Sequence, residues 1–263
     1  LRNTTTLEVE KIVLTDTNTV FYMDAHFTPH YWIKIAGDTY LKANDEKYMI
    51  TGAEGIQIDS LHWMPESGRD SFLLYFPPLP KGTKSVDFIE GDCDGCFKIW
   101  DIALEGTPRK YVSPIPQDAL NAKQDPKAPL PPVEMKSAKT TLTVHTVGLK
   151  EGYVLNTPTL FVDDLFLMDQ IESDPVKNED GSYTFEFYQN GTTTVFVRMG
   201  RVVWRVILQP GEKAEMFIDF TAKSMMEARN NPQKDLKFFG FRGAYAGLNK
   251  ALAEFDRHRY FAI

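Results

Sequence analysis

Residues 85–104 read SVDFIEGDCDGCFKIWDIAL, and this stretch holds both cysteines of the chain, Cys93 and Cys96. Runs rich in strand-forming residues lie on each side of the pair, at 84–90 and 97–104. β-Branched and aromatic residues favour strands, whereas the Gly and Asp residues between the two runs favour a turn. The pattern therefore predicts a β-hairpin with the C-x-x-C pair at its tip.

The sequence before this hairpin is also typical of short strands separated by turns. Phe72, Leu74 and Phe76 lie on one face of an alternating run, as expected of a strand with one buried face. The other expected strands are 7–15, 19–26, 31–36, 39–42, 47–51 and 55–62. Strands of this length and spacing are typical of an antiparallel sandwich, so we expect residues 1–105 to form a first β-sandwich domain.

A change in composition follows at residues 106–137, which contain seven prolines. Proline fixes φ and removes a backbone donor, so it is excluded from central strands. We therefore expect an extended linker here, stiffest at 129–132, with a single helical turn at 118–123.

A second series of strands is expected at 141–147, 159–167, 182–188, 193–199, 202–208 and 214–220. The turn signals Glu179-Asp180-Gly181 and Gln189-Asn190-Gly191 separate several of them. This pattern predicts a second β-sandwich domain at residues 138–221.

The last segment, residues 222–263, changes to a helical pattern. Apolar residues recur at steps of three and four and predict one helical face: Phe241, Tyr245, Leu248, Leu252 and Phe255. The expected fold class is mainly β, with two antiparallel β-sandwich-like domains and a C-terminal helical segment. The chain ends on an apolar helical pattern at Ile263 and begins at Leu1 without a signal peptide, so we expect a processed or cut chain that once continued.

The composition excludes some classes of function. The formal charge of −7 and pI near 5.3 do not favour nucleic-acid binding, which needs a basic face. No apolar run approaches the about 18 residues of a membrane helix. The sequence lacks the common catalytic motifs of hydrolases, nucleotide-binding proteins and zinc proteases, and we predict neither a catalytic residue nor a cofactor.

Cys93 and Cys96 have three interpretations. A redox pair is disfavoured because strand formers follow Cys96, and because Asp92 and Asp94 oppose thiolate formation. A zinc site would need two more ligands, and the histidines are scattered, so we predict no metal. The favoured interpretation is a disulfide, or two packed thiols, with a local structural role.

Two aromatic dipeptides, Tyr31-Trp32 and His62-Trp63, are the other candidates for a site. Trp32 and Trp63 would line a groove for a sugar or a peptide if they are exposed. Core packing is the commoner role for isolated aromatic pairs, and both alternatives stay open.

Two groups of residues resemble a known family. Residues 71–85 (SFLLYFPPLPKGTKS) and 87–102 (DFIEGDCDGCFKIWDI) resemble the amino-terminal region of envelope proteins from Gram-negative anaerobes. Residues 180–187 (DGSYTFEF), 195–199 (VFVRM) and 208–220 (LQPGEKAEMFIDF) resemble the small β domain of unknown function that precedes the thioredoxin fold in those proteins. Residues 237–253 (KFFGFRGAYAGLNKALA) are similar to the helical connector that follows it.

The resemblance implies a thiol-disulfide oxidoreductase with its thioredoxin-like domain at the carboxyl end. The catalytic W-C-x-x-C and cis-proline loop of that domain are absent from this chain, and Cys93 and Cys96 match the upstream β region. The resemblance thus implies a non-catalytic region that serves in positioning, or in binding a partner or substrate. It further implies export to the cell envelope, with membrane attachment through an N-terminal lipid anchor. The alternative is a stand-alone envelope protein that binds carbohydrate or peptide.

Overall fold

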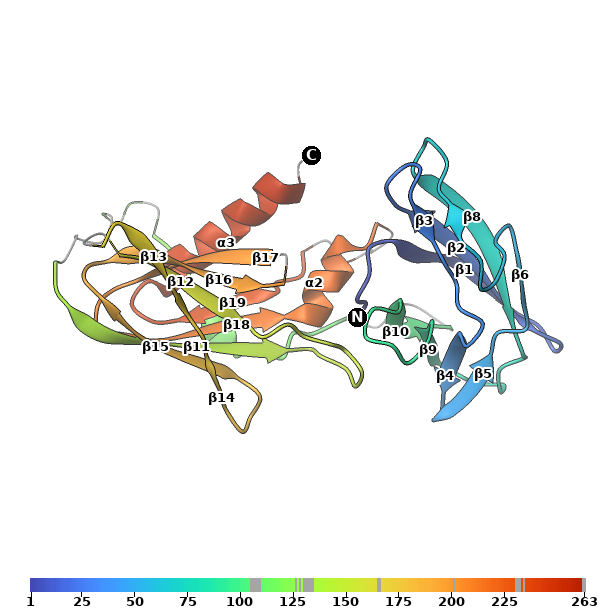
Figure 1. Cartoon of the computed structure of the whole chain (residues 1–263). Helices are drawn as coiled ribbons and strands as arrows, with labels where there is room; N and C mark the ends of the chain where they lie inside the picture. The colour runs from blue at the N-terminus through green and yellow to red at the C-terminus, as the bar shows by residue number, and fades with distance from the viewer. Residues whose placement is uncertain are drawn as a thin grey trace. The chain divides into compact units, whose positions relative to one another are not determined.

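The computed structural model describes residues 1–104, 110–125, 127, 129, 135–164, 167–200, 202–229, 233 and 235–261 (Figure 1). The chain divides into two compact units, each described here by itself. Unit 1 comprises Leu1–Tyr111, Lys150–Tyr153 and Ser224–Asp235, and unit 2 comprises Val112–Leu149, Val154–Lys223 and Leu236–Ile263. The chain is mainly β with few helices, as the sequence predicts.

Unit 1 contains two four-stranded antiparallel sheets. The first has the order β1 (Leu7–Leu14), β2 (Thr19–His26), β8 (Arg69–Phe76) and β6 (Gly52–Glu54). The second has the order β10 (Lys98–Ala103), β9 (Ser85–Ile89), β4 (Tyr40–Ala43) and β5 (Glu46–Met49). A separate two-stranded ribbon joins β3 (Trp32–Ile33) to β7 (His62–Trp63).

Aromatic side chains from both sheets meet in the core of unit 1. The ring of Phe21 on β2 lies 5.5 Å from that of Phe76 on β8 and 6.3 Å from that of Phe88 on β9, between centroids. All three are fully buried, which is the packing expected where the inner faces of two sheets interdigitate. The alternation of Phe72, Leu74 and Phe76 in the sequence correctly predicts the buried face of β8.

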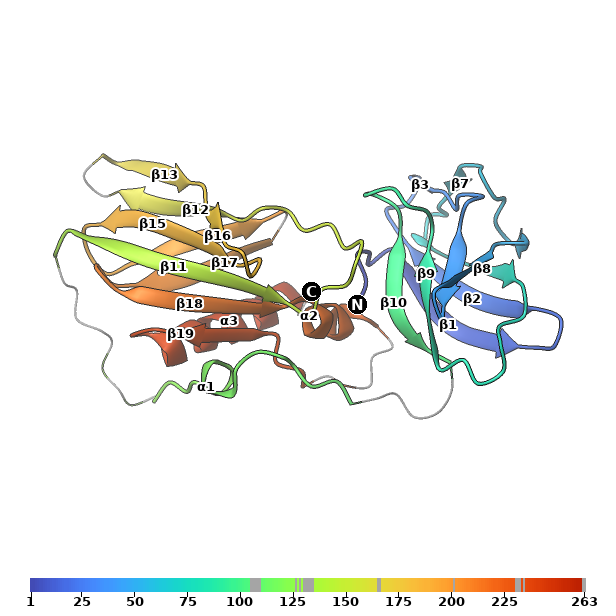
Figure 2. The same ribbon diagram turned by 90° about the horizontal axis from the view of Figure 1, so that it is seen from below.

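Unit 2 contains a five-stranded and a four-stranded sheet (Figure 2). The larger has the order β14 (Val176–Lys177), β15 (Tyr183–Gln189), β11 (Ala138–Val147), β18 (Lys213–Asp219) and β19 (Phe239–Arg242). The smaller has the order β13 (Asp169–Ser173), β12 (Thr159–Asp164), β16 (Thr193–Met199) and β17 (Val202–Leu208). One pair, β11 with β18, is parallel, and the sheets are otherwise antiparallel.

Three helices complete the described structure: α1 (Gln117–Leu120), α2 (Phe220–Glu227) and α3 (Ala246–Phe261). The predicted helical face beginning at Phe241 is wrong in its first part, because Phe239–Arg242 forms a strand beside β18. The edge of β18 offers backbone partners that the sequence pattern does not reveal, and Gly240 weakens a helix at this point.

The predicted apolar face of α3 is also not its most buried one. Asn249 and Lys250 are buried, Leu248 and Leu252 are half-buried, and Phe255 is exposed. The most deeply buried side chains of α3 are therefore polar, although the periodicity predicts that its apolar side chains are the buried ones.

The proline-rich segment differs in part from an extended linker. Ile115, Ala119 and Leu120 are buried and pack with Phe217 of β18, so residues around α1 belong to unit 2. Pro114 and Pro116 flank Ile115 and exclude a strand without preventing its burial. Residues 106–109, 126, 128 and 130–134 of the predicted linker lie outside the described residues, as does residue 105 of the predicted first domain.

Candidate functional site

The β3–β7 ribbon brings together the two tryptophans that the sequence singled out. Trp32 and Trp63 are directly opposite each other, although 31 positions separate them in the chain. The Met64 amide donates to the Tyr31 carbonyl at 2.8 Å, which makes the next pair, Trp32 and Trp63, the non-hydrogen-bonded kind. Side chains approach most closely at such pairs and point to the same face.

Both indoles face solvent. Trp32 is 48% exposed and Trp63 is 61% exposed, so the core alternative is wrong for these two residues. The neighbouring positions, Ile33 and His62, turn inward: Ile33 is buried, and His62 Nε2 lies 2.8 Å from Asp70 Oδ2. The ribbon thus has an anchored inner face and a free aromatic outer face.

The loop before β3 is held in place by backbone hydrogen bonds. The Phe27 amide donates to the Gly68 carbonyl at 2.9 Å, and the His30 amide donates to the Met64 carbonyl at 3.2 Å. Phe27 and Tyr31 make an edge-to-face ring contact at 6.4 Å, and both side chains are exposed. These contacts preorganise the ribbon, which lowers the entropy lost when a ligand binds.

The second candidate region is the cysteine tip, which we define as residues 90–97 between β9 and β10. Cys93 and Cys96 form a disulfide with a Cα–Cα distance of 5.3 Å. The disulfide of the favoured interpretation is thus present, whereas its local structural role stays a prediction. β10 begins at Lys98, within the strand that the sequence predicts at 97–104. Cys93 is exposed and Cys96 is half-buried.

Polar contacts fix the base of the tip. Asn3 Nδ2 donates to the Cys96 carbonyl at 2.8 Å, and the Lys98 amide donates to Asn3 Oδ1 at 2.8 Å. Tyr40 Oη donates to Asp92 Oδ1 at 2.7 Å, and Lys47 Nζ lies 3.2 Å from Asp92 Oδ2. The hydrogen bond from Tyr40, with that from Lys47, lowers the pKa of the Asp92 carboxyl, so Asp92 keeps its negative charge beside Cys93.

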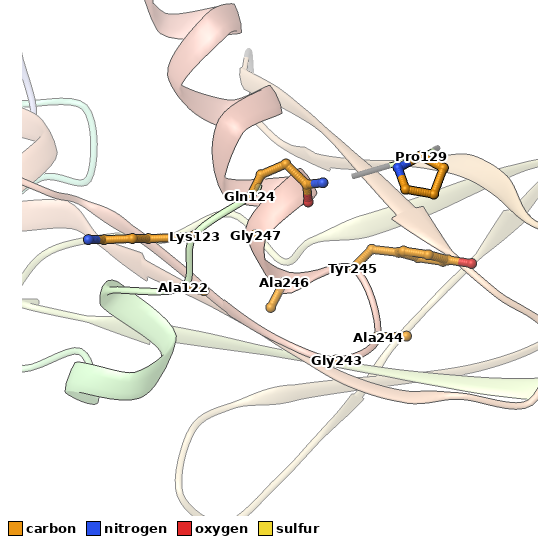
Figure 3. A pocket seen from close by; sticks show the side chains of 9 residues that line it. All are labelled: Ala122, Lys123, Gln124, Pro129, Gly243, Ala244, Tyr245, Ala246 and Gly247. Atoms are coloured by element: carbon orange, nitrogen blue, oxygen red, sulfur yellow. The ribbon is translucent and has the colours of Figure 1, made fainter. Parts of the chain in front are cut away.

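A cavity of about 480 Å³ lies in unit 2 at the amino-terminal end of α3 (Figure 3). Most of its lining is backbone and small side chains, with Lys123, Gln124 and Tyr245 as the polar members. Tyr245 Oη lies 3.3 Å from Gln209 Oε1 and is already engaged. The cavity offers few directed polar groups for a ligand.

Among the described residues, no group of three or more His, Cys, Asp or Glu side chains is arranged to hold a metal ion. The described helices include none long and apolar enough to cross a membrane.

Comparisons with known proteins place the chain in no family. No family model matches it, and no curated protein matches it. The crystal structure of pullulanase from Anoxybacillus sp. LM18-11 shows a similarity with a TM-score of 0.25 and 12% sequence identity. The similarity covers 75% of this chain and 25% of the pullulanase chain, and it is too low to carry an argument about fold or function.

Sequence reasoning identified the four candidate residues but missed how they are supported. Asn3 and Tyr40 reach the cysteine tip from 93 and 52 positions away along the chain, measured to Cys96 and Asp92. No local motif marks such contacts, because they depend on which strands become neighbours.

Proposed function

We propose that this chain is a non-catalytic binding region that captures an extended polypeptide on the outer face of the β3–β7 ribbon. The observation that carries the proposal is the exposed pair formed by Trp32 and Trp63. Tryptophan side chains dominate binding energy at interfaces because they combine a large apolar area with few rotatable bonds.

The ribbon favours a polypeptide over other ligands. Within the described part of the chain, β3 is paired only with β7, so the ribbon has two outer strand edges. An extended peptide can add a strand to such an edge through main-chain hydrogen bonds, while the indoles contact its side chains.

The sequence resemblance supports a parent protein for this region: an exported thiol-disulfide oxidoreductase of the cell envelope, anchored by an N-terminal lipid. In that setting the polypeptide is a substrate or an envelope partner of the thioredoxin-like domain. A thioredoxin-type C-x-x-C in the reading frame after Ile263 is the expected finding, and a stop codon in its place would contradict this parent.

The binding proposal is tested by titrating the chain with a reduced and alkylated unfolded protein, such as α-lactalbumin, and following indole fluorescence and calorimetric heat. We expect the double variant Trp32→Ala/Trp63→Ala to lose about tenfold or more in affinity. Tyr188→Ala is the matched control, because Tyr188 is an exposed aromatic on β15 of unit 2. Equal affinity of the double variant and the wild type would contradict the proposal.

A second candidate function is carbohydrate binding by a stand-alone envelope protein. The observation that favours it is the exposure of both indoles, since the apolar face of a pyranose ring stacks on an exposed indole. Titration with maltoheptaose and chitohexaose, using the same variants, separates the two candidates. Tryptophan-dependent glycan binding without polypeptide binding would establish this second function in place of the first.

The non-catalytic part of the proposal has its own test. A strand follows Cys96, and acidic groups flank Cys93, so the reduced pair lacks the helix N-terminus that lowers a thiol pKa in redox catalysts. We expect the chain and its Cys93→Ser variant to reduce insulin at equal, negligible rates. Turnover that depends on Cys96 would overturn this expectation.

A further inference from the structure

The two sulfurs of the cysteine tip differ in their surroundings. Cys93 is exposed, together with its neighbours Asp94 and Gly95, and a Cβ placed on Gly95 would meet nothing within 4 Å. Cys96 is half-buried, and its Sγ lies 3.3 Å from the position of a Cβ on Gly91, which is itself buried. The Asn3 side chain further fixes the Cys96 backbone. Access for an incoming thiolate is therefore greater at Cys93.

We propose that the Cys93–Cys96 disulfide is a thiol–disulfide exchange site for a partner protein that carries a dithiol, with Cys93 as the sulfur attacked. The site shares no residue with the aromatic ribbon and goes beyond the binding function. In this role the tip is a substrate of a reductase: it accepts electrons from the partner and does not catalyse the reduction of other proteins. The chain is therefore still expected to reduce insulin at a negligible rate.

The exchange follows from known thiol chemistry. One partner thiolate attacks Cys93 Sγ, the Cys93–Cys96 bond breaks, and its electron pair leaves on Cys96 Sγ. The second partner thiolate attacks the partner sulfur of the mixed disulfide and expels Cys93 as a thiolate. Both cysteine thiolates take a proton, from the partner's thiols by way of solvent. The partner dithiol is oxidised to a disulfide, and the tip disulfide is reduced to two thiols.

Charge around the tip selects the partner. Asp38, Asp92 and Asp94 are exposed at or beside the tip, and both carboxylate oxygens of Asp38 lie within 3.2 Å of the Cβ position on Gly91. Lys47 is the cation in contact with Asp92. The remaining negative charge repels an anionic reductant such as glutathione and attracts a dithiol set in a basic surface.

The site of attack is tested by mixing the oxidised full chain with cysteamine, quenching with acid at early times, and locating the mixed disulfide by peptide mass spectrometry. We expect the adduct on Cys93 to exceed that on Cys96 by about tenfold, because access decides which sulfur is attacked. Equal adducts on both cysteines would overturn the assignment of Cys93. Absence of reaction, under conditions that reduce oxidised glutathione, would overturn the exchange site altogether.

The charge selection is tested by comparing cysteamine with 2-mercaptoethanesulfonate at equal thiolate concentration. We expect the cationic thiol to react roughly tenfold faster at low salt, with the preference reduced at high salt. Asp94→Asn should narrow the preference, whereas Asp16→Asn, at the exposed β1–β2 turn, should not. Equal rates for the two thiols would overturn the basic partner.

The Trp32→Ala/Trp63→Ala variant separates this inference from the binding function. It should exchange at the wild-type rate while losing polypeptide affinity. A fall in the exchange rate of this variant would show that the two sites are not separate.

Discussion

Glu90 and Phe97 face each other at the base of the cysteine tip and exchange two hydrogen bonds. The Glu90 amide donates to the Phe97 carbonyl at 2.9 Å, and the Phe97 amide donates to Glu90 Oε2 at 2.8 Å. The carboxylate thus replaces the Glu90 carbonyl in the strand ladder, and that carbonyl accepts a hydrogen bond from Thr39 Oγ1 at 3.2 Å. A buried acidic side chain therefore closes the β9–β10 hairpin before the tip begins.

Glu90→Ala should destabilise unit 1 by about 1–3 kcal/mol, because it leaves the amide of half-buried Phe97 without its side-chain acceptor. Glu90→Gln keeps an acceptor oxygen and should retain most of this stability. Urea unfolding of both variants measures the difference. Equal losses of stability in the two variants would show that the hydrogen bond from the Phe97 amide does not account for the effect.

The two variants also differ in their response to pH. Burial raises the pKa of the Glu90 carboxyl, and the hydrogen bond from the Phe97 amide offsets part of this effect. An acid with a raised folded pKa stabilises the fold most below its unfolded pKa, and this contribution falls as pH rises through the folded pKa. The stability of Glu90→Gln should therefore increase relative to that of the wild type as pH rises. A stability difference between the two that does not change with pH would contradict this.

The Cys93–Cys96 disulfide closes a loop of only four residues, so it should stabilise unit 1 modestly. The loop-closure relation gives roughly 2 kcal/mol for a loop of this size. Cys93→Ala/Cys96→Ala should lose about this amount in urea unfolding, and the reduced wild type should match it. A much larger loss would mean that the disulfide also maintains the contacts of Asn3 or Asp92.

Asn249 of α3 binds the edge of β17 in the way that a neighbouring strand would. Its Oδ1 accepts from the Ile207 amide at 2.7 Å, and its Nδ2 donates to the Ile207 carbonyl at 2.9 Å. Asn249→Ala leaves both groups without a partner and should cost about 2 kcal/mol or more. Glu254→Ala, on the exposed side of α3, is the control and should change stability by less than about 0.5 kcal/mol.

Hydrogen exchange provides a second measurement of the Asn249 contact. The Ile207 amide should exchange faster in Asn249→Ala, since its side-chain acceptor is removed. Unchanged protection at Ile207 would indicate that β17 does not depend on the helix.

The sequence predicted local features well where turn residues and alternation agree. β16 and β17 have the predicted bounds, because Asn190-Gly191 and the alternating pattern mark them. β19 was missed because Phe241 fits the helical spacing of the apolar residues after it, while the strand conformation depends on the edge of β18. A helix beginning at Ala246 was compatible with the same pattern.

The candidate site was predictable only as separate parts. Exposure and pairing of Trp32 and Trp63 depend on the register between two strands of two residues each, and no local pattern encodes that register. The position of Asn249 carries a similar lesson. A polar residue beside a predicted apolar face gives no sign that it pairs with a distant backbone, so its role emerges only when β17 is in place.

Glu212 supplies the last prediction, because both its carboxylate oxygens are buried without a hydrogen-bond partner in the described structure. Burial raises its pKa to about 7. The difference from the ordinary value of 4.5 corresponds to roughly 3 kcal/mol. The protonated Glu212 carboxyl contributes fully to the stability of the fold below pH 4.5, and this contribution is lost as pH rises to about 7.

Glu212→Gln removes the ionisation and should therefore stabilise unit 2 relative to the wild type above pH 7, with a smaller difference at pH 5. Urea unfolding across this range measures the effect, and the exposed Glu179→Gln is the control, which should track the wild type. A stability difference between Glu212→Gln and the wild type that stays constant across this pH range would mean that the buried carboxyl gains a compensating partner when it ionises. Because its oxygens have no hydrogen-bond partner in the described structure, water or a cation entering the β17–β18 turn would have to supply that partner.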